Sequence, residues 1–156
     1  MKHTILMLSL VGAATAAHAA EVEPGNVSFE NGAVETSLTD KPGDPERGRE
    51  VVGDKSAGNC VACHAISEMT DVAWHGEIGP PLDGAGERWS DAQLRGMLVN
   101  AKKMFPGTMM PAFYKVDGFT RPGDAYTGEA APEDLDPILS AQQIEDVVAY
   151  LSTLKY

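Results

Sequence analysis

The stretch that decides the fold is GNCVACHAIS, residues 58–67. It contains Cys60 and Cys63, the two cysteines of this 156-residue chain, and His64 directly after the second. Two thiols three positions apart with an imidazole beside them can form a redox disulfide, part of a zinc site or an attachment site for a prosthetic group. The neighbouring sequence discriminates between these three kinds of site.

Covalent attachment of a haem explains this stretch better than the other two. A disulfide of the thioredoxin kind leaves His64 without a role and is expected after a β-strand, but no alternating run precedes Cys60. A structural zinc ion needs four ligands, and only three candidates cluster here. In Cys-x-x-Cys-His, both thiols form thioethers to haem c, so Cys60 and Cys63 bind the cofactor and His64 is the proximal iron ligand.

The N-terminal residues 1–19 are typical of a cleaved secretory signal peptide. Lys2 precedes an apolar run from Ile5 to Val11, and Ala17-His18-Ala19 offers small residues at a cleavage site. An uncleaved membrane anchor is the alternative, but the apolar run is too short and too rich in alanine to span a bilayer. We therefore expect an exported protein located in the periplasm.

The chain is acidic, with a formal net charge of −11 at pH 7. Nucleic acids and anionic lipids bind through clusters of lysine and arginine, so neither is an expected partner. The acidity can steer a basic partner or serve only solubility. The length suffices for one domain, of a size at which a bound cofactor adds noticeably to a small core.

The ligand on the other side of the iron decides the function of a haem held by one histidine. Methionine or histidine at that position makes an electron carrier, and an open position allows ligand binding or peroxidase-like chemistry. In NAKKMFPGTMMPAF, residues 100–113, Pro106-Gly107 predicts a turn and Pro111 favours an extended backbone before it. Adjacent residues in an extended loop point to opposite sides. We predict Met110 as the ligand, with Met109 as the next candidate.

His75 is a more remote candidate for the same position. It lies so close in sequence to His64 that reaching the opposite haem face requires an awkward loop, so we expect it to be exposed or to face a propionate. The run GPPLDGAGERW, residues 79–89, is a Gly/Pro loop whose carbonyls have few partners. One of these carbonyls can accept the Nδ1 proton of His64 and fix the orientation of the ring.

Three helix starts are visible in the sequence. Asp44-Pro45-Glu46 offers an N-cap, a proline at the first helical position and an acid in the first turn. Ser90 to Gln93 and Ser140 to Gln143 each form a predicted capping box. The second box precedes an apolar stripe at helical spacing, made of Ile144, Val147, Val148, Leu151 and Leu154. We predict an all-α fold.

These motifs resemble class I cytochromes c over about residues 44–156. CVACH, GPPL, Arg88, PGTMM and a terminal helix with Ala149-Tyr150-Leu151 occur in the order and spacing of that family. The resemblance implies helices and loops wrapped around one covalent haem c, with Gly48 and Tyr150 where the first and last helices cross. It also implies roles around the haem: the Pro80 carbonyl orients His64, Arg88 and Trp89 lie near a propionate, Thr108 bonds near the other propionate, and Met110 is the sixth ligand.

The longer run IGPPLDGAGERWSDAQLRGMLVNAKKMFPGTMMPAFY, residues 78–114, is similar to the SoxX family. Its members are monohaem subunits of the SoxAX cytochromes of bacterial thiosulfate oxidation. The resemblance implies a heterodimer with SoxA, whose active site couples a sulfane sulfur to a cysteine of the carrier SoxYZ, an L-cysteine S-thiosulfotransferase reaction. It implies electron transfer from SoxA to an acceptor cytochrome c, and a chain that is not catalytic alone because thioethers consume both thiols.

Two extensions flank the predicted cytochrome domain. Residues 20–43 form an N-terminal arm before it, and residues 115–137 lengthen the loop before the last helix. Both segments suit a subunit that docks to a partner, and both equally suit solvated or disordered surface. A free periplasmic cytochrome c that carries electrons between respiratory complexes remains the alternative function, and a haem peroxidase or gas-binding protein is a third.

Overall fold

The computed structural model describes residues 21–120, 122 and 128–156. The predicted signal peptide, residues 1–19, lies outside these described residues. The helices are α1 (Pro45–Gly53), α2 (Ala85–Arg88), α3 (Asp91–Asn100) and α4 (Ala141–Thr153), with 3-10 turns η1 (Pro24–Asn26), η2 (Cys60–Ala62) and η3 (Ala101–Lys103). The described residues form no β-strand, so the predicted all-α class is confirmed. Among them, no helix is long and apolar enough to cross a membrane.

The three long helices begin where the capping signals predict. The side chain of Asp44 accepts hydrogen bonds from the backbone N–H groups of Glu46 and Arg47 at the start of α1, where Pro45 is the first helical residue. Ser90 at α3 and Ser140 at α4 each form both bonds of a capping box. These caps satisfy N–H groups that have no partner inside a helix.

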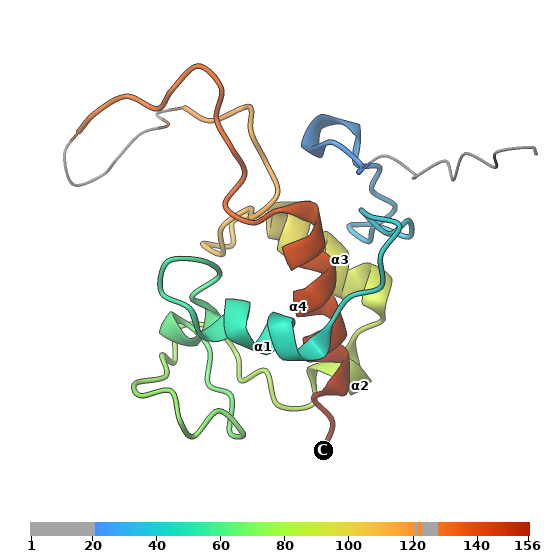
Figure 1. The fold of residues 1–156 in the computed structure, drawn as a ribbon, viewed down its shortest axis with the longest axis vertical. Coiled ribbons are helices and arrows are strands. Elements are labelled where there is room, and N and C mark those ends of the chain that lie inside the picture. Colours follow the sequence, from blue (N-terminus) through green and yellow to red (C-terminus); the bar gives the residue numbers. More distant parts are fainter. Residues whose placement is uncertain (1–20, 121, 123–127) are drawn as a thin grey trace, which may run out of the picture.

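The N-terminal and C-terminal helices cross at close range, as Figure 1 shows for α1 and α4. Gly48 permits this approach, because an added Cβ would lie 2.0 Å from the Asp146 carbonyl oxygen and 2.8 Å from Tyr150 Cβ. The crossing of Gly48 and Tyr150 that the resemblance implied is therefore confirmed. Asp146 also accepts hydrogen bonds from the Asp44 backbone N–H (2.8 Å) and Arg47 Nε (3.0 Å), which join the start of α1 to α4.

The core is formed mainly by one face of α4 and by the helices that pack on it. The predicted apolar stripe of α4 is buried throughout. It packs in one cluster with side chains from the other segments, which are Val51, Val52, Val61, Ile66, Met69, Leu94, Leu98, Val99, Phe113 and Tyr114. The segment that carries the two cysteines therefore contributes to the same core as α1, α3 and α4.

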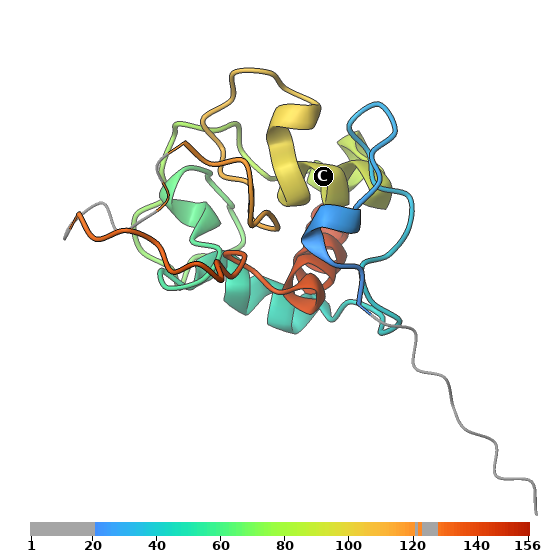
Figure 2. The ribbon, with the colours of Figure 1, turned by 90° about the horizontal axis from the view of Figure 1, so that it is seen from above.

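The N-terminal arm packs on the domain from residue 21 onward. Figure 2 shows it, in blue, beside α3 and α4. Its side chains Val34 and Leu38 are buried. Arg95 donates to both oxygens of Glu145 (2.8 and 2.9 Å) and to the Val34 carbonyl (2.8 Å), and the Leu38 N–H donates to Glu145 (2.8 Å). A buried pair with these additional bonds fixes the path of the arm across the two helices.

Candidate haem site

One helical turn brings the motif residues together. The His64 N–H donates to the Cys60 carbonyl (2.9 Å), and so does the Cys63 N–H (3.1 Å). Residues at i, i+3 and i+4 of such a turn share one side, so both thiols and the imidazole are presented together. Val61, within the same turn, is buried and anchors it to the core.

The surroundings of Cys60 do not suit a redox disulfide. Burial raises the pKa of the Cys60 thiol to about 11. A thiol that exchanges disulfides readily has a lowered pKa, because the thiolate is the nucleophile. The structure therefore gives no support to the thioredoxin-like alternative.

The imidazole of His64 is held in one orientation by the loop before α2. Its Nδ1 lies 2.7 Å from the Pro80 carbonyl oxygen. A carbonyl only accepts, so the Nδ1–H donates and Nε2 retains the lone pair that a metal needs. Gly79 lies against the ring, since an added Cβ would be 2.2 Å from His64 Cε1. Any side chain at position 79 would displace the ring from this position.

Arg88 holds the backbone of that same loop. Its Nη2 donates to the Pro81 carbonyl (2.9 Å), and its Nη1 donates to the Asp83 carbonyl (2.5 Å) and to the Tyr156 hydroxyl (3.2 Å). The resemblance to cytochromes c implied that Arg88 lies near a propionate, and this remains a prediction. In the structure its terminal nitrogens bind loop carbonyls, and through them Arg88 stabilises the segment that includes Pro80.

Trp89 links this loop to the methionine loop. It is partly buried against the core. Its ring packs edge-to-face on Phe105, with centroids 6.0 Å apart and planes at 78°. Phe105 directly precedes Pro106-Gly107, so the contact joins the loop of the proximal histidine to the loop of the predicted sixth ligand.

The predicted turn in the methionine loop is present. Gly107 has φ +86°, and the Thr108 N–H donates to the Phe105 carbonyl (3.1 Å). This is a type II turn, in which proline at the second position and glycine at the third are preferred. Thr108, expected to bond near a propionate, accepts at Oγ1 from the Met110 N–H (3.3 Å). It thus fixes the backbone of the predicted ligand.

Met109 and Met110 point to different sides, as expected for neighbours in an extended loop. The Met109 side chain is 76% exposed, whereas Met110 is partly buried and packs against the core cluster. The thioether on the interior side therefore belongs to Met110. Sequence reasoning missed one contact here: Lys102 Nζ donates to the Met110 carbonyl (2.6 Å). No sequence signal pointed to Lys102, since the bond joins residues eight positions apart across a loop.

His75 is partly buried rather than exposed. Its Nδ1 accepts from the Ile66 N–H (3.2 Å), so its proton is on Nε2. His75 Nε2 is buried and has no hydrogen-bond partner among the described residues. Buried donors are normally paired, so this N–H fits an acceptor that belongs to a bound polar group or water. Of the two expectations for His75, an exposed ring is wrong, and a ring facing a propionate remains a prediction.

The donor set suits a metal held in a macrocycle. Within the described residues, no three or more His, Cys, Asp or Glu side chains are grouped so that they could hold a metal ion. The cysteine motif provides two thiols and one imidazole, which the Pro80 carbonyl orients, and the methionine loop provides one interior thioether. Two axial ligands and two attachment points are sufficient only when four further ligands come with the metal, as in a haem.

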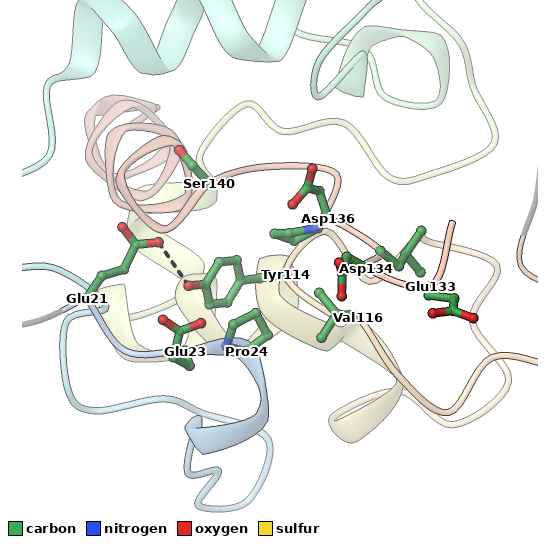
Figure 3. Close-up of a pocket in the computed structure, with 11 residues that line it drawn as sticks. Glu21, Glu23, Pro24, Tyr114, Val116, Glu133, Asp134, Asp136 and Ser140 are labelled. Atoms are coloured by element: carbon green, nitrogen blue, oxygen red, sulfur yellow. Dashed lines mark hydrogen bonds between the residues drawn. The ribbon is translucent and has the colours of Figure 1, made fainter. Parts of the chain in front are cut away.

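A separate pocket of about 600 Å³ lies between the N-terminal arm and the segment before α4. Figure 3 shows Glu21 and Glu23 on one side and Glu133, Asp134 and Asp136 on the other. At the edge of this pocket, the Tyr114 hydroxyl lies 2.8 Å from the Val22 carbonyl oxygen and 3.1 Å from a Glu21 carboxylate oxygen, and these two acceptors share its one proton. No residue of the cysteine motif or the methionine loop lines it, so it is distinct from the candidate haem site.

The comparisons with known proteins agree with this geometry. The cytochrome c family model matches residues 45–155. The chain is also similar to a chain of the crystal structure of SoxXA from P. pantotrophus, with 59% sequence identity and a TM-score of 0.84. That match covers 88% of this chain and 100% of the other. No curated protein matches the sequence.

Proposed function

This chain belongs to the cytochrome c family, and we propose that it is the monohaem electron-transfer subunit of a SoxX–SoxA complex that oxidises thiosulfate. It has the cytochrome c fold and carries one covalently bound haem c. The observation that carries the proposal is the 59% identity to a chain of SoxXA over the whole length of that chain.

When bound, the haem supplies one-electron redox chemistry at its iron. Cys60 and Cys63 hold it through two thioethers. His64 would ligate through Nε2, because its Nδ1–H is committed to the Pro80 carbonyl at 2.7 Å. This hydrogen bond fixes the ring and makes the ligating nitrogen more basic.

Met110 occupies the sixth position in this proposal and makes the site an electron carrier. It lies on the interior side of a loop that a type II turn makes rigid. A thioether at that position leaves no open site for a peroxide or a gas, which disfavours the peroxidase and gas-binding alternatives. Arg88 and Trp89 would lie near one propionate and Thr108 near the other, and all three also hold the loops of the site in place.

The sulfur chemistry belongs to the partner in this proposal. Both cysteines of the chain are consumed by thioethers, so no thiol remains to form a bond to a sulfane sulfur. SoxA would perform that step, SoxYZ would carry the conjugated sulfur, and this subunit would accept the electrons and pass them to another cytochrome c. The chain alone is therefore not expected to be an L-cysteine S-thiosulfotransferase.

The location and domain organisation complete the proposal. Residues 1–19 would direct export to the periplasm and be removed there, and residues 44–156 would form the haem domain. Residues 20–43 remain an N-terminal arm, whose buried side chains Val34 and Leu38 make it a component of the folded domain.

Purification of the native protein from cells oxidising thiosulfate tests the function. We expect a second polypeptide in equal amount, and reduction of the haem by thiosulfate and carrier protein only when that polypeptide is present. Recovery of this chain alone, with no copurifying polypeptide and no thiosulfate-dependent reduction, would instead indicate a free periplasmic electron carrier. Sulfur conjugation by this chain in the absence of SoxA would contradict the subunit assignment.

A further inference from the structure

The backbone of Met110 is held by two side chains instead of a helix or strand. Its N–H donates to Thr108 Oγ1 (3.3 Å), and its carbonyl accepts from Lys102 Nζ (2.6 Å). The next residue is Pro111, which has no N–H to contribute to any local backbone bond. The position of Met110 therefore depends on side-chain contacts, and one of them comes from outside its own turn.

The bond from Lys102 crosses the methionine loop. At the base of this loop, the Phe113 and Tyr114 N–H groups donate to the Leu98 and Val99 carbonyls (3.1 and 3.3 Å), which tie the returning chain to α3. Lys102 lies on η3, directly after α3, and its own N–H donates to the Asn100 side chain (3.3 Å). The ammonium thus extends from a fixed backbone to the carbonyl of Met110.

The chemistry of this bond makes it well suited to positioning. An ammonium donor to a carbonyl is a charge-assisted hydrogen bond and stronger than a neutral one. A thioether is a neutral, weak ligand, so small displacements of its backbone change how well it competes with water. A site that is loose by about 1 Å commonly loses function even when all its residues are present.

From these contacts we infer that Lys102 is a positioning residue for the sixth ligand, which it holds in place through the backbone carbonyl of Met110. The inference rests on the proposed function, because it requires Met110 to ligate the iron. It adds to that function a residue outside the PGTMM motif, which controls how tightly the Met110 thioether is held at the sixth position of the iron.

Lys103 offers a matched control. It carries the same charge on the same turn, but its Nζ lies over the Phe29 ring, 5.6 Å from the centroid. Both lysines are exposed. Replacing either by alanine removes one positive charge near the loop, so a difference between the two variants reports the bond to Met110 and not the change in charge.

The test compares the ferric holoproteins of Lys102→Ala, Lys102→Arg, Lys103→Ala and Met110→Ala. Two readouts are the long-wavelength sulfur-to-iron absorbance band and the rate of binding of imidazole, a small ligand that must displace the sixth ligand. Lys102→Ala should weaken the band and speed imidazole binding by roughly three- to tenfold, about what one exposed charged hydrogen bond contributes. Lys103→Ala should behave as the unmodified protein, and Lys102→Arg should retain most of the original slow binding.

The outcomes separate this inference from the function on which it rests. If Met110→Ala abolishes the band while Lys102→Ala behaves like Lys103→Ala, the positioning role is wrong and the electron-transfer assignment stands. If Met110→Ala keeps the band, the ligand assignment and the inference both fail. Because Lys102 is exposed, its variants should fold. If Lys102→Ala does not, Lys102→Gln, which removes the charge and shortens the side chain, is judged by the same two readouts.

Discussion

At the scale of single residues, Met109 and Met110 are an internal pair for testing the iron ligand. They share nearly the same local sequence, but Met109 is 76% exposed and Met110 packs against the core. Met110→Ala should abolish the long-wavelength band and lower the reduction potential, within the span of roughly 0.8 V that axial ligands cover. Met109→Ala should keep the band and most of the potential.

Absorbance spectra and redox titration of both purified variants check this prediction. The reverse order of effects would make Met109 the ligand. Because the band reports a sulfur ligand, its retention in both variants would assign the sixth position to another methionine of the chain.

The two cysteines provide a second prediction at this scale. Cys60→Ser or Cys63→Ser should greatly reduce the yield of holoprotein, because each removes one thioether and a small domain depends on its cofactor for much of its core. Haem staining and far-UV circular dichroism of periplasmic extracts measure this. Normal amounts of folded, haem-free protein from the double variant would show that the fold does not need covalent haem.

At the scale of helices, Asp146 makes the α1–α4 crossing sensitive to acid. Burial acts to raise the pKa of this carboxyl, but hydrogen bonds from Arg47, Gln142 and the Asp44 backbone N–H outweigh it, and the pKa is lowered. Because the pKa is lower in the folded state, the ionised carboxylate stabilises the fold at pH values above the pKa of the unfolded chain, which is about 3.9. This stabilisation is lost as the pH falls below that value toward the folded pKa.

We therefore expect Asp146→Asn to lower the free energy of unfolding at neutral pH by about 1–3 kcal/mol, since it leaves partners of a buried group unsatisfied. The difference in free energy between the variant and the unmodified protein should shrink below about pH 4. There Asp146 of the unmodified protein becomes protonated in the unfolded chain, and the stabilisation by its ionised form decreases. Urea titrations at several pH values measure both effects. A difference that does not change with pH would assign the effect to packing alone.

At the scale of the whole molecule, the N-terminal arm is a structural part of the haem domain. Removal of residues 21–38 would expose the surface that Val34 and Leu38 cover and would leave Arg95 and Glu145 without their backbone partners on the arm. We expect the truncated holoprotein to unfold at a lower temperature, with its sulfur-to-iron band unchanged because no arm residue belongs to the haem site.

Thermal unfolding followed by circular dichroism checks the effect of this truncation. Ser28→Ala, an exposed position on the arm, is a control that should leave the unfolding temperature unchanged. An unchanged unfolding temperature in the truncated protein would mean that the arm contributes nothing to stability and is available for docking to a partner.

The sequence predicted features that depend on adjacent residues. Pro106-Gly107 produced its turn, Asp44, Ser90 and Ser140 started their helices, and Cys60, Cys63 and His64 indicated a haem c. The cytochrome c family, its fold and the single covalent haem are confirmed. For the turn, the helix caps and the haem motif, the relevant atoms lie within a few residues of one another, so local geometry decides the outcome.

Only the tertiary structure decided which distant groups meet. It placed the terminal nitrogens of Arg88 on loop carbonyls, buried the Arg95–Glu145 pair beneath the arm, and joined Lys102 to Met110. It also determined that Met110, and not its neighbour, faces the interior. These contacts depend on the path that the chain takes as its helices pack on α4. Packing is a cooperative property of the whole core, and no short stretch of sequence contains it.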